Sequence, residues 1–243
     1  MRGGFCMLEE GPDARDSDTG HNSKAGQLYG QLKSLFVLQK LPPGTRLEMA
    51  SVAKRFGVSI TPVREALILL ANERIIAKDS NRSYVTRPLV AQEVRDDYEA
   101  AFMTACYCIE NRTAHFEATG LRVGSAQATS QWGVSDRLRS ICQTIELLYE
   151  RIAGLIGNER LERQMLEFND RTHYVRQLDM RNEKRHQETA VAMNELVTLL
   201  EAGDAQSAIA NLKQQFRRKH ELIPTLVREG NLAALESVNL FAE

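Results

Sequence analysis

Hydrophobic residues recur every three or four positions over most of the chain, a spacing that predicts a mainly helical protein. The first stripe lies between residues 24 and 40 and consists of Leu28, Leu32, Leu35 and Phe36. Two shorter helical stretches are expected at about 48–56 and 61–74, with Gly57 in the turn between them. Lys33 lies off the apolar face of the first stripe, and its replacement by alanine is expected to have little effect on DNA binding.

Strands are expected in one place only. Apolar residues at 75–77 and 84–86 flank the turn-rich segment 79–83, a pattern typical of a β-hairpin. Beyond Pro88 the stripes are all helical, and they predict a bundle of about six helices.

Together these elements predict a mainly α protein with two parts. A helix, a glycine-containing turn, a second helix and a basic hairpin form the layout of a winged helix-turn-helix, expected over residues 24–90. Residues 91–243 are expected to form an all-α bundle large enough to hold a core and an internal cavity. Residues 1–23 are polar, rich in glycine and without periodicity, which predicts a disordered tail.

The charge is unevenly distributed, although the whole chain has a net charge of only −1. Residues 24–87 hold eleven Lys or Arg against four acids, whereas residues 88–243 hold 18 bases and 23 acids. A basic module of this kind beside an acidic one is typical of a protein that touches a polyanion with one part only.

Several functional classes lack support in the sequence. There is no membrane-length apolar run, no secretory leader and no catalytic constellation, so we expect a cytoplasmic protein that is not an enzyme. The four cysteines include no CxxC pair, which favours reduced thiols over a disulfide framework. We therefore expect no cofactor and no association with a membrane.

The second helix of the motif carries the candidate DNA-binding residues. Thr61 is predicted as its N-cap, with Pro62 as its first helical residue. Ile60, Thr61 and Arg64 then share one face, where Arg64 can donate two hydrogen bonds to a guanine edge. Arg82, at the tip of the hairpin, suits a narrow minor groove or its phosphates.

The motif also resembles a known family. The run Gly-Val-Ser-Ile-Thr-Pro-Val-Arg-Glu-Ala-Leu over residues 57–67, preceded by Leu-Pro-Pro-Gly-Thr-Arg-Leu at 41–47, is similar to the DNA-binding domain of GntR-family transcription regulators. The remainder resembles the FCD-type effector domain of that family's FadR-like branch. Its signals are Gly157-Asn158 before Leu161, and Glu201-Ala202-Gly203-Asp204 before Ala208.

This resemblance implies a DNA-binding transcription regulator, with a repressor preferred. Ser59, Thr61 and Arg64 match operator contacts of the family, Arg82 matches the wing, and Arg46 is a candidate phosphate contact. Two alternatives remain: Thr61 could serve only as a helix cap, and Arg46 could be a solvated surface charge.

Three positions depart from the family's pattern. Ile60 replaces an arginine, so an apolar contact to a thymine methyl is expected there. Arg74 replaces a glycine after the second helix, where it must either avoid the left-handed conformation or tolerate its strain. Ser83 replaces the glycine of the wing.

Many FCD domains hold a divalent metal through one Asp and three His, so the resemblance also implies four positions for a metal site in this chain. Counted from Gly157 and Gly203, these positions fall on Ile145, Tyr149, Met193 and about Gln215, none of which is a good ligand for a divalent cation. We therefore expect no metal. The alternative is an insertion that moves Asp170, His173, His186 or His220 into the cavity.

Tyr149, Met193 and Gln215 then become candidate effector-binding residues, and a neutral or apolar effector is expected. In the competing interpretation these side chains fill the core, and the protein is a ligand-independent DNA-binding dimer with a C-terminal dimerisation platform. Either way, the expected partners are a second copy of the chain and a near-palindromic double-stranded DNA operator.

Overall fold

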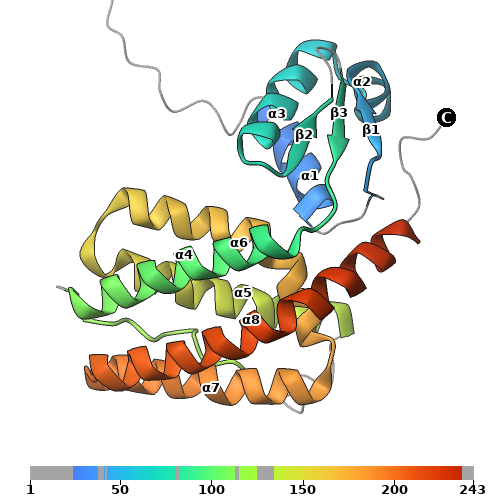
Figure 1. The fold of residues 1–243 in the computed structure, drawn as a ribbon. Helices are drawn as coiled ribbons and strands as arrows, with labels where there is room; N and C mark the ends of the chain where they lie inside the picture. Colours follow the sequence, from blue (N-terminus) through green and yellow to red (C-terminus); the bar gives the residue numbers. More distant parts are fainter. Residues whose placement is uncertain are drawn as a thin grey trace, which may run out of the picture.

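The computed structural model describes residues 24–37, 41, 43–79, 83–112, 115–124 and 134–236. The predicted tail at 1–23 and Arg82 of the wing lie outside these residues. In Figure 1, a small unit that contains α1, α2, α3 and the sheet stands above a layer of longer helices. Because helices dominate and one small sheet accompanies them, the predicted mainly α fold class is confirmed.

The upper unit is the predicted winged helix-turn-helix. Its elements are α1 (Lys24–Val37), β1 (Arg46–Glu48), α2 (Met49–Phe56), α3 (Ile60–Asn72), β2 (Ile76–Lys78) and β3 (Ser83–Thr86). The hairpin strands β2 and β3 are antiparallel, and β1 adds a third strand on the other side of β3. The sequence analysis missed β1, because a strand of three residues is too short to show periodicity.

The turn between α2 and α3 depends on Gly57. Its φ of 64° is left-handed, a conformation that glycine adopts without a steric penalty. The N–H of Val58 donates to the carbonyl oxygen of Ala53 at 3.1 Å, which ends α2 and turns the chain toward α3. The buried residues Val63 and Leu67 then hold α3 against the small core.

The predicted N-cap of α3 was wrong by two residues. The helix begins at Ile60, and its N-cap is Ser59, which has extended backbone dihedrals and makes no capping hydrogen bond through its side chain. Pro62 is therefore the third helical residue. Proline is tolerated throughout the first turn, where N–H groups have no intrahelical acceptor, so it did not fix the first residue of the helix.

Arg74 adopts the left-handed conformation that its family position requires. Its φ is 60°, and it is the non-glycine residue with positive φ among the described residues. Its N–H donates to the Ala71 carbonyl at 3.0 Å, and its own carbonyl accepts from Arg87 at 3.2 Å. The structure therefore retains the turn and accepts its strain.

The lower unit is a helical bundle. Its elements are α4 (Ala91–Glu110), α5 (Val134–Ala153), the 3₁₀ turn η2 (Gly154–Ile156), α6 (Glu159–Met180), α7 (Glu183–Ala202) and α8 (Ala205–Leu235). The described residues thus contain five α-helices here, one fewer than expected. Helix α4 ends at Glu110, and Phe116 packs on the core from an irregular segment beyond it.

Helix α8 also holds the linker between the two units. The side chain of Asn231 accepts from the N–H of Leu89 at 2.8 Å and donates to its carbonyl at 2.9 Å. Gly230 permits this approach, because a Cβ there would lie only 2.8 Å from side-chain atoms of Leu89 and Leu178.

A second connection joins α1 to α6. Lys33 of α1 lies 3.0 Å from a carboxylate oxygen of Glu73 and 2.5 Å from one of Asp170, so it bridges α3 and α6. Burial raises the pKa of Asp170, and the neighbouring ammonium group opposes that shift. The sequence did not reveal these contacts of Lys33, because its partners are distant in the chain, and the expected small effect of Lys33→Ala on DNA binding stays a prediction.

The strain at Arg74 yields a first prediction. Arg74→Gly should raise the free energy of unfolding by about 1 kcal/mol, because glycine removes the left-handed penalty of about 1–2 kcal/mol. Urea unfolding of the N-terminal unit measures this. Arg74→Ala is the control, since it keeps a Cβ and should stay near the native value. Equal stabilities of the two variants would show that φ at this position carries no strain.

Candidate nucleic-acid interface and ligand cavity

One face of α3 is directed away from the small core. Ile60 and Ile68 are 47% and 43% exposed, and Thr61 and Arg64 between them are exposed as well. The opposite face is buried through Val63, Ala66, Leu67 and Leu70. The predicted grouping of Ile60, Thr61 and Arg64 on one helix face therefore holds, and the exposed N-cap Ser59 lies directly before them.

Arg64 is the cation best placed to act outside the protein. Within the described residues it takes part in no ion pair, and its side chain is exposed. A guanidinium in this position can make bidentate hydrogen bonds to a guanine edge or a phosphate.

Arg46 has a different environment. It belongs to β1, where it donates to the Ser83 hydroxyl at 3.3 Å and lies 3.7 Å from carboxylate oxygens of both Glu48 and Asp79. With its side chain 59% exposed, Arg46 can still reach a phosphate, although the carboxylates of Glu48 and Asp79 partly neutralise its charge. Ser83 is buried in β3 and occupies the place of the family's wing glycine.

Two basic residues near the motif were missed by the sequence analysis. Lys54 and Arg55 occupy the last turn of α2, immediately before the turn at Gly57, and both are exposed. The sequence shows them as a Lys-Arg pair, but such a pair by itself does not distinguish a phosphate contact from a solvated surface charge.

The bundle encloses a cavity of about 60 Å³ between α4, α5, α6, α7 and α8. A water molecule needs about 10–15 Å³ by this measure, so the space exceeds that of a packing defect. Its wall is largely apolar and includes several aromatic rings, of which Phe102 and Phe216 are stacked at a ring-centroid distance of 4.8 Å. Tyr98 and Tyr149 each pack edge-on against Phe168.

The four positions derived from the glycine offsets meet in this cavity. Ile145 and Tyr149 reach it from α5, Met193 from α7 and Gln215 from α8. None of Asp170, His173, His186 and His220 lines it, so the insertion alternative has no support in the arrangement of the helices. Asp170 instead contacts Lys33, and His173 contacts Glu146 at 2.6 Å.

These residues do not fit a divalent metal. Ile145 has no donor atom, Met193 offers a thioether, and Gln215 offers one neutral carbonyl. Loss of hydration raises the pKa of Tyr149 to about 12, so its phenol stays protonated at neutral pH. Among the described residues, no group of three or more His, Cys, Asp or Glu side chains is arranged to hold a metal ion.

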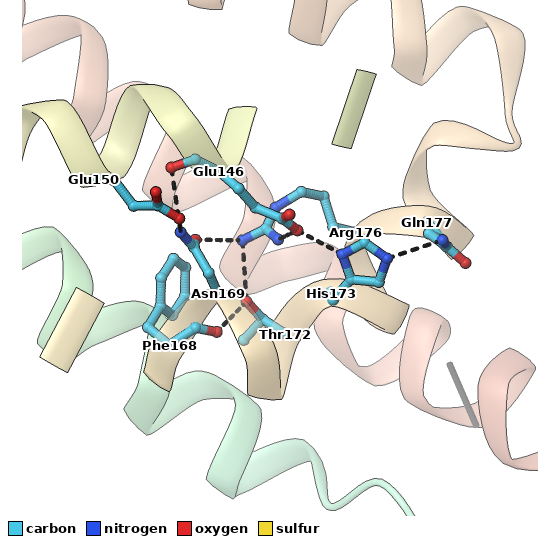
Figure 2. A network of polar contacts seen from close by, with 8 residues as sticks. All are labelled: Glu146, Glu150, Phe168, Asn169, Thr172, His173, Arg176 and Gln177. Atoms are coloured by element: carbon cyan, nitrogen blue, oxygen red, sulfur yellow. Dashed lines mark hydrogen bonds and ion pairs between the residues drawn. The ribbon is translucent and has the colours of Figure 1, made fainter. Parts of the chain in front are cut away.

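Beside the cavity lies a buried polar network that the sequence did not reveal. Figure 2 shows Glu146 of α5 between Arg176 and His173 of α6, with one carboxylate oxygen 2.5 Å from the guanidinium. Arg176 also donates to Asn169 and Thr172. This network joins α5 to α6 and places the Arg176 side chain in the cavity wall.

A second ionic group, which the sequence analysis also missed, lies in the same wall. Asp179 of α6 has a side chain only 2% exposed and forms ion pairs with Lys219 of α8 and, at 3.1 Å, with Arg185 of α7. Lys219 also lies over the ring of Tyr98, 5.7 Å from its centroid.

Two sequence families match the chain. Residues 24–85 match the family described as bacterial regulatory proteins, gntR family, and residues 125–218 match the FCD domain. The HTH-type transcriptional regulator YdhC of Bacillus subtilis is 22% identical over 209 residues, which cover 84% of this chain and 92% of YdhC. The Nta operon transcriptional regulator of Aminobacter aminovorans is 25% identical over 195 residues, with coverage of 77% and 90%.

The fold has solved counterparts. A GntR transcriptional regulator from Rhodococcus sp. RHA1 superposes with a TM-score of 0.68 at 19% identity, covering 83% of this chain and 98% of the other. The matched families and relatives are transcription regulators, which confirms that the chain is not an enzyme. No helix in the described part of the chain is long and apolar enough to span a membrane.

The chemistry of the cavity yields a second prediction. The purified protein should hold no stoichiometric zinc, nickel or manganese, and a chelator should change neither its melting temperature nor its binding to DNA, because the four wall positions supply no charged ligand. Elemental analysis after extensive dialysis measures this. About one tightly held transition metal per chain would contradict the assignment of these positions.

Proposed function

Because the chain belongs to the GntR family of transcription regulators and carries an FCD domain, we propose that it is a homodimeric repressor controlled by a small molecule. In this proposal α3 reads an operator, and the cavity of the FCD domain receives the effector. The observation that carries it is the exposed, unpaired Arg64 on the outer face of α3, within the part of the chain that the structure describes.

Each candidate residue has a role in the proposed DNA complex. Arg64 reads a base edge in the major groove, Thr61 and Ser59 contact the backbone or a base, and Ile60 packs on a thymine methyl. Arg46 holds a phosphate beside the wing, and Arg82 of the wing reaches the adjacent minor groove. The exposure of Ser59, Ile60, Thr61 and Arg64 supports the roles proposed for the outer face of α3.

A dimer follows from the size of the reading surface. One recognition helix contacts only a few base pairs, so a symmetric pair of helices on a near-palindromic site doubles the sequence that is read. The FCD domain would supply the contact between the two copies.

Helix α6 offers a physical route from the cavity to the DNA-binding unit. Phe168 and Arg176 of α6 line the cavity, and Asp170 between them pairs with Lys33 of α1. A ligand that shifts α6 therefore moves a contact of the N-terminal unit. Ligand control requires only that the effector bind the two arrangements with different affinity.

The competing function is that of a ligand-independent DNA-binding dimer. The unsuitable metal positions and the modest volume of the cavity favour it. It differs from our proposal in a single respect, since no small molecule would then change the affinity for the operator.

The DNA-binding role of α3 leads to a third prediction. Arg64→Ala should weaken specific operator binding by about 1–3 kcal/mol per half-site, because a bidentate contact to a base is lost. A titration at fixed salt on a selected operator measures this. Arg163→Ala, an exposed arginine of α6, is the control for the loss of one positive charge and should bind as the native protein does. Unchanged affinity of Arg64→Ala would exclude the assigned face.

The effector role of the cavity leads to a fourth prediction. In a thermal-shift screen of metabolites, at least one compound should raise the melting temperature in proportion to the logarithm of its concentration, because ligands that bind only the native state stabilise it by mass action. The same compound should lower the affinity for the operator. A compound that stabilises the protein without changing operator binding would favour the ligand-independent dimer.

A further inference from the structure

We infer that the crevice between the N-terminal unit and the bundle binds a linear organic diammonium ion, such as an aliphatic diamine in its protonated form. The site is separate from the cavity inside the bundle, and the inference does not depend on effector control by that cavity. It rests on a surplus of carboxylates around the crevice, on a buried phenol without a partner in its wall, and on the apolar side chains between them.

The crevice has a volume of about 470 Å³, and both units contribute to its wall. The N-terminal unit supplies the end of α1 and the turn between α3 and β2, the bundle supplies the start of α4 and the middle of α6, and the linker at residues 87–90 lies between them. A water molecule needs about 10–15 Å³ by this measure, so the crevice can hold a molecule of several non-hydrogen atoms. Such a molecule would contact both units at once.

Carboxylates outnumber cations in this wall. Together the charged side chains leave an excess of two negative charges, and a ligand with two positive charges would balance it. The acids that line the crevice are Glu73, Glu93, Asp96, Asp97 and Glu167, and the bases are Arg74, Arg87 and Arg171.

The surplus is concentrated where α4 faces α6. Arg171 is shared by Asp97 at 2.8 Å and by Glu167 at 3.3 Å, so one positive charge meets two negative charges. Asp96 accepts from the neutral amide of Gln92 at 2.7 Å and has no cationic partner among the described residues. These carboxylates would therefore gain from a further cation close by.

The N-terminal side of the crevice does not offset this surplus. Arg87 lies 2.5 Å from a carboxylate oxygen of Glu93, so these two side chains balance each other. Lys33, which does not line the crevice, is shared by Glu73 at 3.0 Å and Asp170 at 2.5 Å, and again one cation meets two acids. Both sides of the crevice thus favour the binding of positive charge.

A buried phenol of α6 supplies a neutral acceptor. Tyr174 lines the crevice and is only 6% exposed, and its hydroxyl makes no hydrogen bond within the described part of the chain. Burial raises the pKa of Tyr174, so the phenol keeps its proton at neutral pH and its oxygen can accept from an N–H group. Buried polar groups without a partner are uncommon in folded proteins, and this one points to a ligand.

Apolar side chains lie between the polar groups and define the body of the ligand. Phe36 and Ile75 come from the N-terminal unit, Leu89 and Val90 from the linker, and Val94 from α4. An alkyl chain would lose its contact with water against this surface, which favours binding. A hydrated Mg²⁺ ion has no such part, and no group of three or more acidic, His or Cys side chains in the described residues is arranged to hold a metal ion.

Calorimetry on the full chain tests the inference with putrescine, a four-carbon diamine that carries an ammonium group at each end at neutral pH. Its controls are butylamine with one ammonium group, butanediol with none, and magnesium chloride without an apolar body. Putrescine should bind about tenfold or more tightly than butylamine, because the second ammonium gains a hydrogen bond between charged groups, and butanediol should not bind. No saturable binding of putrescine at millimolar concentration, or an equal affinity for Mg²⁺, would overturn the inference.

Two variants locate the site. Tyr174→Phe removes only a hydroxyl without a partner, and Glu167→Gln removes one negative charge while Arg171 keeps its pair with Asp97. Each should weaken putrescine binding about threefold to tenfold, because one contact of an ammonium group is lost. Glu99→Gln is the matched control, since this exposed acid of α4 does not line the crevice, and it should bind as the native chain does.

Unchanged affinity of either folded variant would place putrescine outside the crevice and overturn the inference, so one variant decides the question if the other does not fold. No DNA is present in these titrations. Their outcome is therefore independent of the proposed role as a repressor and of any ligand in the cavity of the bundle.

Discussion

The buried ion pair between Arg176 and Glu146 fixes the relation of α5 to α6, and both the cavity and the contact with the N-terminal unit depend on that relation. The side chain of Arg176 is only 3% exposed, so separation of the pair would leave a charge in a poorly hydrated interior. Asn169 and Thr172 accept its remaining hydrogen bonds and hold the guanidinium in one orientation. The wall of the cavity is therefore rigid where Arg176 forms it.

The cavity wall carries an ionic group as well as apolar side chains, since Asp179 and Lys219 both line it. A lysine carries its charge on a flexible stem, which adapts to the position of its partner. The shared carboxylate of Asp179 restrains Lys219 without neutralising it fully, because Arg185 competes for the same group.

The sequence predicted what depends on local spacing. The outer face of α3 followed from helical periodicity around Arg64, whereas the resemblance to the FCD family, with its offsets from Gly157 and Gly203, brought Tyr149, Met193 and Gln215 to one cavity. It could not predict what depends on distant partners. The ion pair between Lys33 and Asp170 joins residues 137 positions apart in the chain, and the group around Asp179 draws on three separate helices.

The clamp of Asn231 on Leu89 has a consequence for motion between the two units. Because α8 holds both backbone groups of Leu89, the chain from this residue onward moves with the bundle. The pivot is thus confined to the few residues between β3 and Leu89, and the ring of Pro88 stiffens one of them. A hinge of so few residues allows the N-terminal unit to rotate in few directions and to translate very little. Helix α8 lines the cavity along its first half and contacts the hinge near its end, so a small rotation of α8 at the cavity becomes a displacement at the hinge.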